Sequence, residues 1–201
     1  MANRKERLPI ARRLVHTTDR VFGITVSQNP LVVFWRVHVV PRVVALIPRE
    51  KHLLQFAFRL ISQIGIHYRN SSLSQDGSLG SFPRKAPRPG DRLPFVTFHE
   101  NNELINIQNK VKAPAFHLFL FPKNISDEKI KPMRDLVDRY GDLIQICVIS
   151  FSLSTADLYE AFGVRKGGYY LVRPEMYIAY RSARFKVEHM KAFLKRIAIL
   201  S

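Results

Sequence analysis

A stretch near the middle of the chain, residues 70–94, carries no hydrophobic period and divides the sequence into two parts. Ser, Gly and Pro supply 12 of its 25 residues, NSSLSQDGSLGSFPRKAPRPGDRLP. Such a composition is typical of a linker or a long surface loop. We therefore predict a first part, 1–69, a linker, 70–94, and a second part, 95–201.

The first part, 1–69, is predicted to be helical. Apolar residues recur every three to four positions, as on one face of a helix, at Leu8, Ala11, Val15, Thr18 and Phe22. Asn29-Pro30 is typical of a helix start, with Asn as the cap and Pro at the first helical position. Pro41 is expected to interrupt the apolar run that follows. A third helix is expected from Pro48 to Gly65.

The second part, 95–201, alternates strands and helices. We expect a hairpin with Asn101 and Asn102 at its turn, and then a strand, 117–121, a helix, 127–140, a strand, 143–150, a helix, 154–162, two strands within 169–181 and a helix, 186–199. With right-handed crossovers this order is thioredoxin-like. The predicted fold class is therefore α/β, a helical segment followed by a thioredoxin-like domain with a central sheet flanked by helices.

The chain is strongly basic, with 32 Lys and Arg against 16 Asp and Glu. Residues 1–69 hold 12 of these basic residues and only 3 of the acidic ones. This charge favours an acidic partner, so a basic binding module for nucleic acid, a membrane surface or an acidic protein is our alternative function. Arginines beside Phe22, Phe34 and Trp35 could stack on bases, but no nucleic-acid-binding phrase accompanies them. We interpret them as solvated helix faces and do not expect nucleic-acid or membrane binding.

Four phrases of the chain resemble one enzyme family. ERLPIARRLVHTTDRVF, RLISQIGIHYRNSSLS, RPGDRLPF and YYLVRPEMYIAYRS are similar to the C-terminal part of FAD-dependent aromatic hydroxylases, the group of phenol hydroxylase and the polyketide hydroxylases. The resemblance extends over nearly the whole chain. It implies that 1–69 corresponds to the closing helices of the FAD and substrate domain, and 95–201 to the appended thioredoxin-like domain. For the full-length family it implies FAD and NAD(P)H.

The motifs that hold FAD in that family are absent from this sequence. No GxGxxG is present, Gly90-Asp91 lies in the predicted linker, and Gly141-Asp142 ends a predicted helix. We therefore expect a truncated form of such a monooxygenase that binds no cofactor by itself. We assign it no catalytic, cofactor-binding or metal-binding residue and no reaction of its own, and we expect a structural or interface role.

Redox chemistry is not expected in the thioredoxin-like part. A redox member needs CxxC after the first core strand, where this chain reads FPKNISDE, and Gly168 stands where the usual cis-proline would fall. Cys147, the one cysteine, lies in an apolar run and is interpreted as a small buried residue. The 7 histidines are scattered, without a metal-binding pair spacing.

The partners and the compartment follow from apolar content and cysteine use. One cysteine and no apolar run long enough to span a bilayer predict a soluble protein of a reducing compartment, the cytoplasm. Residues 32–46 are too apolar for three short helices to bury among themselves. We expect an exposed apolar patch, rimmed by arginines, that drives self-association or binds a partner chain.

Overall fold

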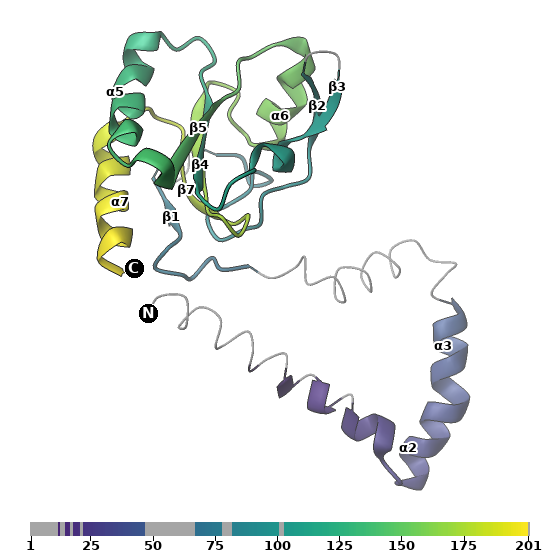
Figure 1. Ribbon diagram of the computed structural model, residues 1–201. Helices are drawn as coiled ribbons and strands as arrows, with labels where there is room; N and C mark the ends of the chain where they lie inside the picture. The colour runs from purple at the N-terminus through teal and green to yellow at the C-terminus, as the bar shows by residue number, and fades with distance from the viewer. Residues whose placement is uncertain are drawn as a thin grey trace. The chain divides into compact units, whose positions relative to one another are not determined.

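The computed structural model describes residues 12, 15–16, 18–20, 22–46, 67–77, 82–100 and 103–200 (Figure 1). The chain divides into two units, 1–66 and 67–201. The predicted helix from Pro48 to Gly65, the segment around Leu8 and the turn at Asn101 and Asn102 lie outside the described residues.

The described part of the first unit is helical. Residues 22–26 are helical, and helix α2 spans Pro30–Phe34. The predicted helix start is confirmed, since the Asn29 side chain accepts a hydrogen bond of 3.0 Å from the Leu31 N–H and Pro30 takes the first helical position.

Pro41 does not end this helix, so the predicted interruption is wrong. The chain continues through a π-helical turn, Trp35–Val39, into helix α3, Val40–Leu46. A proline lacks the N–H that would donate to the carbonyl four residues earlier, and its ring crowds that carbonyl. The wider π-helical turn directly before Pro41 accommodates both effects, and the segment remains one helix.

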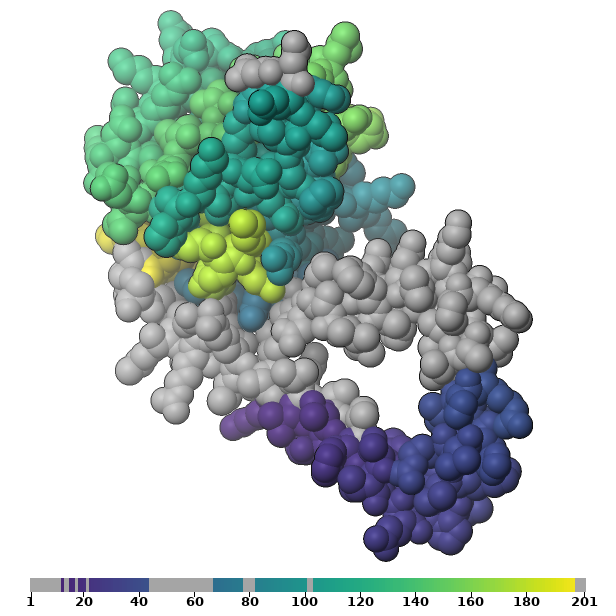
Figure 2. Space-filling model, turned by 45° about the vertical axis from the view of Figure 1, so that its right-hand side comes forward, coloured from purple at the N-terminus to yellow at the C-terminus, as the bar shows by residue number. Residues whose placement is uncertain are grey.

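The large apolar side chains of this segment face solvent (Figure 2, purple and blue). Leu31 is 79% exposed, Phe34 60% and Trp35 59%. None of the side chains whose burial is described between residues 12 and 43 is buried. The described part of the first unit therefore has no core of its own.

The second unit is built on a five-stranded sheet in the order β1-β7-β6-β4-β5. Strand β4 is parallel to β5 and antiparallel to β6, which is antiparallel to β7. This arrangement, with a helix between β4 and β5 and a helix after β7, confirms the predicted α/β, thioredoxin-like fold. The strands are β1 (Gln75–Asp76), β4 (Phe116–Phe121), β5 (Ile144–Val148), β6 (Gly168–Val172) and β7 (Ile178–Ser182), and β2 (Thr97–Glu100) and β3 (Glu103–Asn106) form a separate hairpin.

Both faces of the sheet are covered (Figure 1). Helices α5 (Asp127–Asp138) and α7 (Val187–Leu200) pack on one face, while α6 (Ala156–Ala161) and the β2–β3 hairpin pack on the other. Side chains of β4 alternate between the two layers, with Leu118 and Leu120 toward α5 and α7, and Phe119 and Phe121 toward α6. Burial on both faces explains why this strand reads as a continuous apolar run.

The stretch that we expected to be a linker is packed into the second unit. Its residues Gln75 and Asp76 form β1, which pairs in parallel with the edge of β7. Leu93 is buried in the core, and its N–H donates to the Met176 carbonyl at 2.7 Å. Gly90 serves a tight turn here, where its φ of 87° and its close approach to the Tyr68 backbone exclude a side chain.

Candidate functional site

The loop between β4 and α5, where redox members of this fold carry their thiols, holds none here. It reads Pro122-Lys123-Asn124-Ile125-Ser126. The Lys123 ammonium lies 3.5 Å from the centre of the Phe151 ring, a cation–π contact. None of these side chains is a nucleophile of the kind that thiol exchange requires.

Two glycines, Gly167 and Gly168, occupy the region opposite this loop. The predicted proline position, Gly168, begins β6, while Gly167 faces the loop. A Cβ at Gly167 would lie 2.7 Å from Ile125 Cδ1 and 3.0 Å from the Phe121 carbonyl oxygen. The described residues contain no cis peptide bond. The place of the usual redox site is therefore closed by direct packing of Ile125 against the glycine backbone.

Cys147 lies in β5, partly buried against the layer that contains α6. Burial raises the pKa of its thiol, and a nearby Lys110 only partly opposes this effect. A thiol with a raised pKa is a poor nucleophile at neutral pH, which agrees with its interpretation as a small core residue. Within the described ranges, no three His, Cys, Asp or Glu side chains come together as metal ligands.

Asp91 binds side chains at the start of the second unit, those of His67 and Arg69. Its carboxylate accepts hydrogen bonds from Arg69 Nε at 2.6 Å, Arg69 Nη2 at 3.0 Å and the Arg88 N–H at 2.9 Å, and His67 Nδ1 lies 3.0 Å away. Burial alone would raise the pKa of Asp91, but these hydrogen bonds and the neighbouring charges outweigh it and hold the pKa below its usual range. The carboxylate therefore stays ionised and bound.

A second acid–arginine pair joins β1 to β7. Arg181, whose side chain is 8% exposed, donates from Nε at 2.8 Å and from Nη2 at 2.5 Å to Asp76 Oδ2. Its Nη1 donates to the Pro87 carbonyl at 2.8 Å, and its guanidinium lies 4.2 Å from the centre of the Phe82 ring. Arg181 is thus buried with a charge partner and further acceptors.

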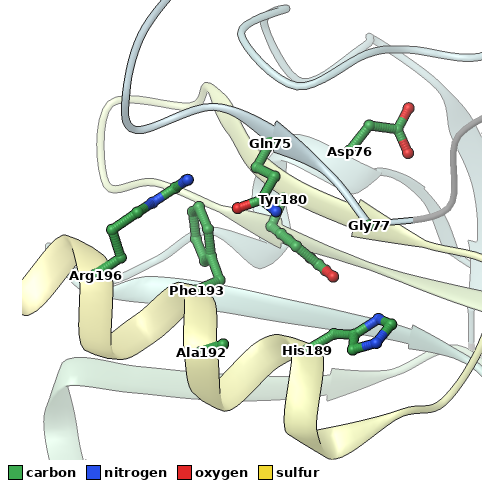
Figure 3. A pocket seen from close by; sticks show the side chains of 8 residues that line it. All are labelled: Gln75, Asp76, Gly77, Tyr180, His189, Ala192, Phe193 and Arg196. Carbon is green, nitrogen blue, oxygen red and sulfur yellow. The ribbon is translucent and has the colours of Figure 1, made fainter.

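Two pockets adjoin β1, and Asp76 lines both. The first, of ≈ 410 Å³, lies between β1 and α7 (Figure 3). Tyr180 and Phe193 supply its aromatic surface, with His189 and Arg196 from α7 at its rim, and Figure 3 shows Asp76 turned away from these α7 residues. The second pocket, of ≈ 540 Å³, lies on the Arg181 side and is lined mainly by arginines and prolines of residues 69–89.

These anchoring residues were not predicted as a site from the sequence. Asp91 and Arg181 do stand within two of the phrases that carry the family resemblance, RPGDRLPF and YYLVRPEMYIAYRS. That signal could have marked them as structurally important. Their partners, Arg69 and Asp76, could not be assigned, because pairing residues 22 and 105 positions apart requires the fold.

Two described arginines of the first unit bond to their own segment. Arg36 Nη1 donates to the Thr25 carbonyl, and Arg42 Nη1 donates to the His38 carbonyl. Of the helices that the structure describes, none combines the length and apolar character that crossing a bilayer requires.

The two Gly-Asp pairs of the described residues do not fit a flavin site. Gly90-Asp91 cannot offer its carboxylate to a ribityl chain, since that carboxylate is bound by Arg69 and the Arg88 N–H. Gly141-Asp142 forms an exposed 3₁₀ turn, Gly141–Leu143, after α5. Neither Gly-Asp pair is placed to cradle a cofactor phosphate or sugar.

The fold of this chain is similar to parts of solved flavin-dependent enzymes. The flavin-dependent monooxygenase PieE, in complex with FAD and substrate, matches 95% of this chain over 39% of its own, with a TM-score of 0.58 and 19% identity. OxyS anhydrotetracycline hydroxylase from Streptomyces rimosus matches 89% of this chain over 31% of its own, with a TM-score of 0.51 and 15% identity. Aklavinone-11 hydroxylase, in a complex with FAD and aklavinone, matches 66% of this chain over 26% of its own, with a TM-score of 0.50 and 18% identity.

These likenesses show a shared fold. No family model matches the sequence, and no curated protein matches it significantly. The chain spans between 26% and 39% of the length of the three hydroxylases. Its fold is therefore that of a part of these enzymes, as the resemblance in the sequence implies.

Proposed function

We propose that this chain is the C-terminal part of a FAD-dependent aromatic hydroxylase and that it has a structural and interface role there. The observation that carries the proposal is the match to PieE, which extends over 95% of this chain and so runs through both units. The four phrases that resemble this family, spread from the first unit to β7, support the same proposal. FAD and NAD(P)H then belong to the enzyme as a whole.

In this proposal the second unit is a rigid scaffold. Its β4–α5 loop offers no thiol, and the thiol of Cys147 has a raised pKa because of burial. A buried acid–arginine pair, Asp76–Arg181, and a partly exposed one, Asp91–Arg69, hold the described residues of 67–94 on the second unit. Such a domain positions surfaces and does not transfer electrons.

The first unit supplies the interface. The exposed side chains of Leu31, Phe34 and Trp35 are large and apolar, and a helix of this kind is stable when another surface covers it. The flavin and substrate domain of the hydroxylase is the cover that we propose. When that domain is absent, we expect the same side chains to drive self-association.

The proposal is tested on a tagged chain recovered from its own cells. We expect the chain to co-purify with an equimolar amount of a flavoprotein. This complex should be yellow and should oxidise NAD(P)H when a phenolic compound is present. The chain purified alone should be colourless and should not quench added FAD fluorescence. A chain that is recovered alone, or that itself binds FAD one to one, would contradict the proposal.

A further inference from the structure

The pocket on the Arg181 side of β1 has a strongly basic lining. Four arginines, Arg69, Arg84, Arg88 and Arg181, face its ≈ 540 Å³ together with one carboxylate, Asp76. A volume of this size lies within the range of small-molecule sites, about 300–1,000 Å³. The charge of the lining distinguishes this pocket from the neighbouring one, which a single arginine, Arg196, lines.

Two of the four arginines are committed to ion pairs. Arg181 neutralises Asp76, and Arg69 binds Asp91 through Nε and Nη2, which leaves its Nη1 outside that pair. Arg84 and Arg88 are exposed, and within the part of the chain that the structure describes their side chains form no ion pair. Two guanidinium groups of the pocket lining, those of Arg84 and Arg88, are therefore not neutralised by a described carboxylate.

A polar atom in the wall also lacks a partner. Ser74 Oγ is buried and makes no hydrogen bond among the described residues. Burying a hydroxyl without a hydrogen bond is unfavourable, and a buried polar atom of this kind usually has a bound partner. Ser74 and Asn70 line the same pocket as Arg84 and Arg88, so a buried hydroxyl and an amide lie in the wall beside the two guanidinium groups.

We propose that this pocket binds the phosphate group of a small organic phosphate ester. The planar guanidinium fork matches phosphate oxygens, and a hydroxyl can donate to a further oxygen. Asp76 does not repel the anion, since Arg181 neutralises it and holds it by two hydrogen bonds. Phe82, which also lines the pocket, offers an apolar contact to the organic part of the ester. The proposal does not depend on the proposed function.

Nuclear magnetic resonance of the full chain tests the proposal, with inorganic phosphate, phenyl phosphate and benzoate as probes. We expect saturable shifts of the Arg84 and Arg88 Nε–H signals and of the Ser74 amide, with phenyl phosphate bound more tightly than inorganic phosphate. Arg84→Gln with Arg88→Gln should weaken phenyl phosphate binding at least tenfold, because charged hydrogen bonds are lost. Arg139→Gln with Arg165→Gln changes the net charge equally outside the pocket and should leave binding unchanged.

Three results would overturn the proposal. Equal affinity of the pocket variant and the charge-matched variant would show that Arg84 and Arg88 do not form the site. Equal affinity for benzoate and phenyl phosphate would show that the pocket recognises any organic anion. Binding of a short RNA, without binding of phenyl phosphate, would assign the charge to general nucleic-acid attraction. Ser74→Ala gives a second measurement, with a smaller loss of about threefold expected.

Discussion

The two units of this chain use similar apolar content in opposite ways. In the second unit, β4 sends Leu118 and Leu120 to one layer and Phe119 and Phe121 to the other, and all four are fully buried. In the first unit, the helix from Pro30 to Leu46 is apolar over most of its length, yet Phe34 and Trp35 are more than half exposed.

The difference lies in what each segment has beside it. A strand in the middle of a sheet has neighbours on both edges and layers on both faces, so every apolar side chain finds a partner. A helix that is apolar nearly all round has to be covered from outside. Apolar composition is therefore a sign of burial, and among the described residues it is met by burial within the chain in the second unit and not in residues 22–43.

Two intrinsic signals separate the units in solution. All 7 tyrosines lie at or beyond Tyr68, in the second unit, and the one tryptophan, Trp35, lies in the first. Near-ultraviolet circular dichroism of tyrosine therefore follows the second unit, and tryptophan emission follows the first.

The largest contrast is expected from a matched pair of phenylalanine truncations. Phe121 is fully buried and contacts the rings of Tyr159 and Phe162, so Phe121→Ala should lower the free energy of unfolding of the second unit by about 3–5 kcal/mol. Phe34→Ala should change it by less than about 0.5 kcal/mol. Urea unfolding followed through tyrosine measures both, and equal losses would break the distinction between the units.

A smaller but still large effect is expected at the β1–β7 ion pair. Asp76→Ala leaves the Arg181 charge buried without its carboxylate and should cost about 3 kcal/mol. Glu160→Ala is the matched control, because it removes the exposed Arg165–Glu160 pair and should cost under about 0.5 kcal/mol. If Asp76→Ala unfolds at the same urea concentration as the control, β1 is not held by this pair.

Acid should release the Asp91 anchor. Because the folded-state pKa of Asp91 is lowered, its contribution to stability is complete above its unfolded pKa of about 3.9 and is lost as the pH falls through the lower folded value. The stability difference between the native chain and Asp91→Asn, measured at pH 5, should therefore shrink as the pH falls below about pH 4. A difference that grew as the pH fell from 5 to 2 would contradict the assigned direction.

The smallest effect is expected at Cys147. Since Cys147 is only partly buried, Cys147→Ala should cost no more than about 1 kcal/mol. Since burial raises the pKa of its thiol, the chain should not reduce insulin. An insulin turnover assay checks this. Turnover that disappears in Cys147→Ser would show a reactive thiol and overturn the scaffold role.

Most of the second unit could be predicted from its sequence, because each element carries a local signal. The apolar run at 117–121, the amphipathic helix that begins at Asp127 and the turn around Pro174 appear in the structure within a few residues of their predicted places. Periodicity and turn residues depend only on near neighbours, which explains this success.

The anchors and the continuity of the first helix could not be predicted in the same way. The Ser- and Pro-rich segment 70–94 has no hydrophobic period. Its place on the sheet depends on the ion pairs that Asp76 forms with Arg181 and Asp91 forms with Arg69. These are pairings between distant positions. The π-helical turn that accommodates Pro41 is a local adjustment, but the same sequence is equally compatible with a break.

The central claim is that the first unit is an interface that lacks its cover, and Trp35 tests it most directly. At low concentration we expect emission typical of an exposed indole and strong quenching by acrylamide, since Trp35 is 59% exposed. As the concentration rises, emission should shift to the blue and quenching should fall as the chain self-associates, and Trp35→Glu should weaken that assembly without changing the tyrosine signal of the second unit. A monodisperse monomer at high micromolar concentration, with Trp35 already shielded from acrylamide, would contradict the account.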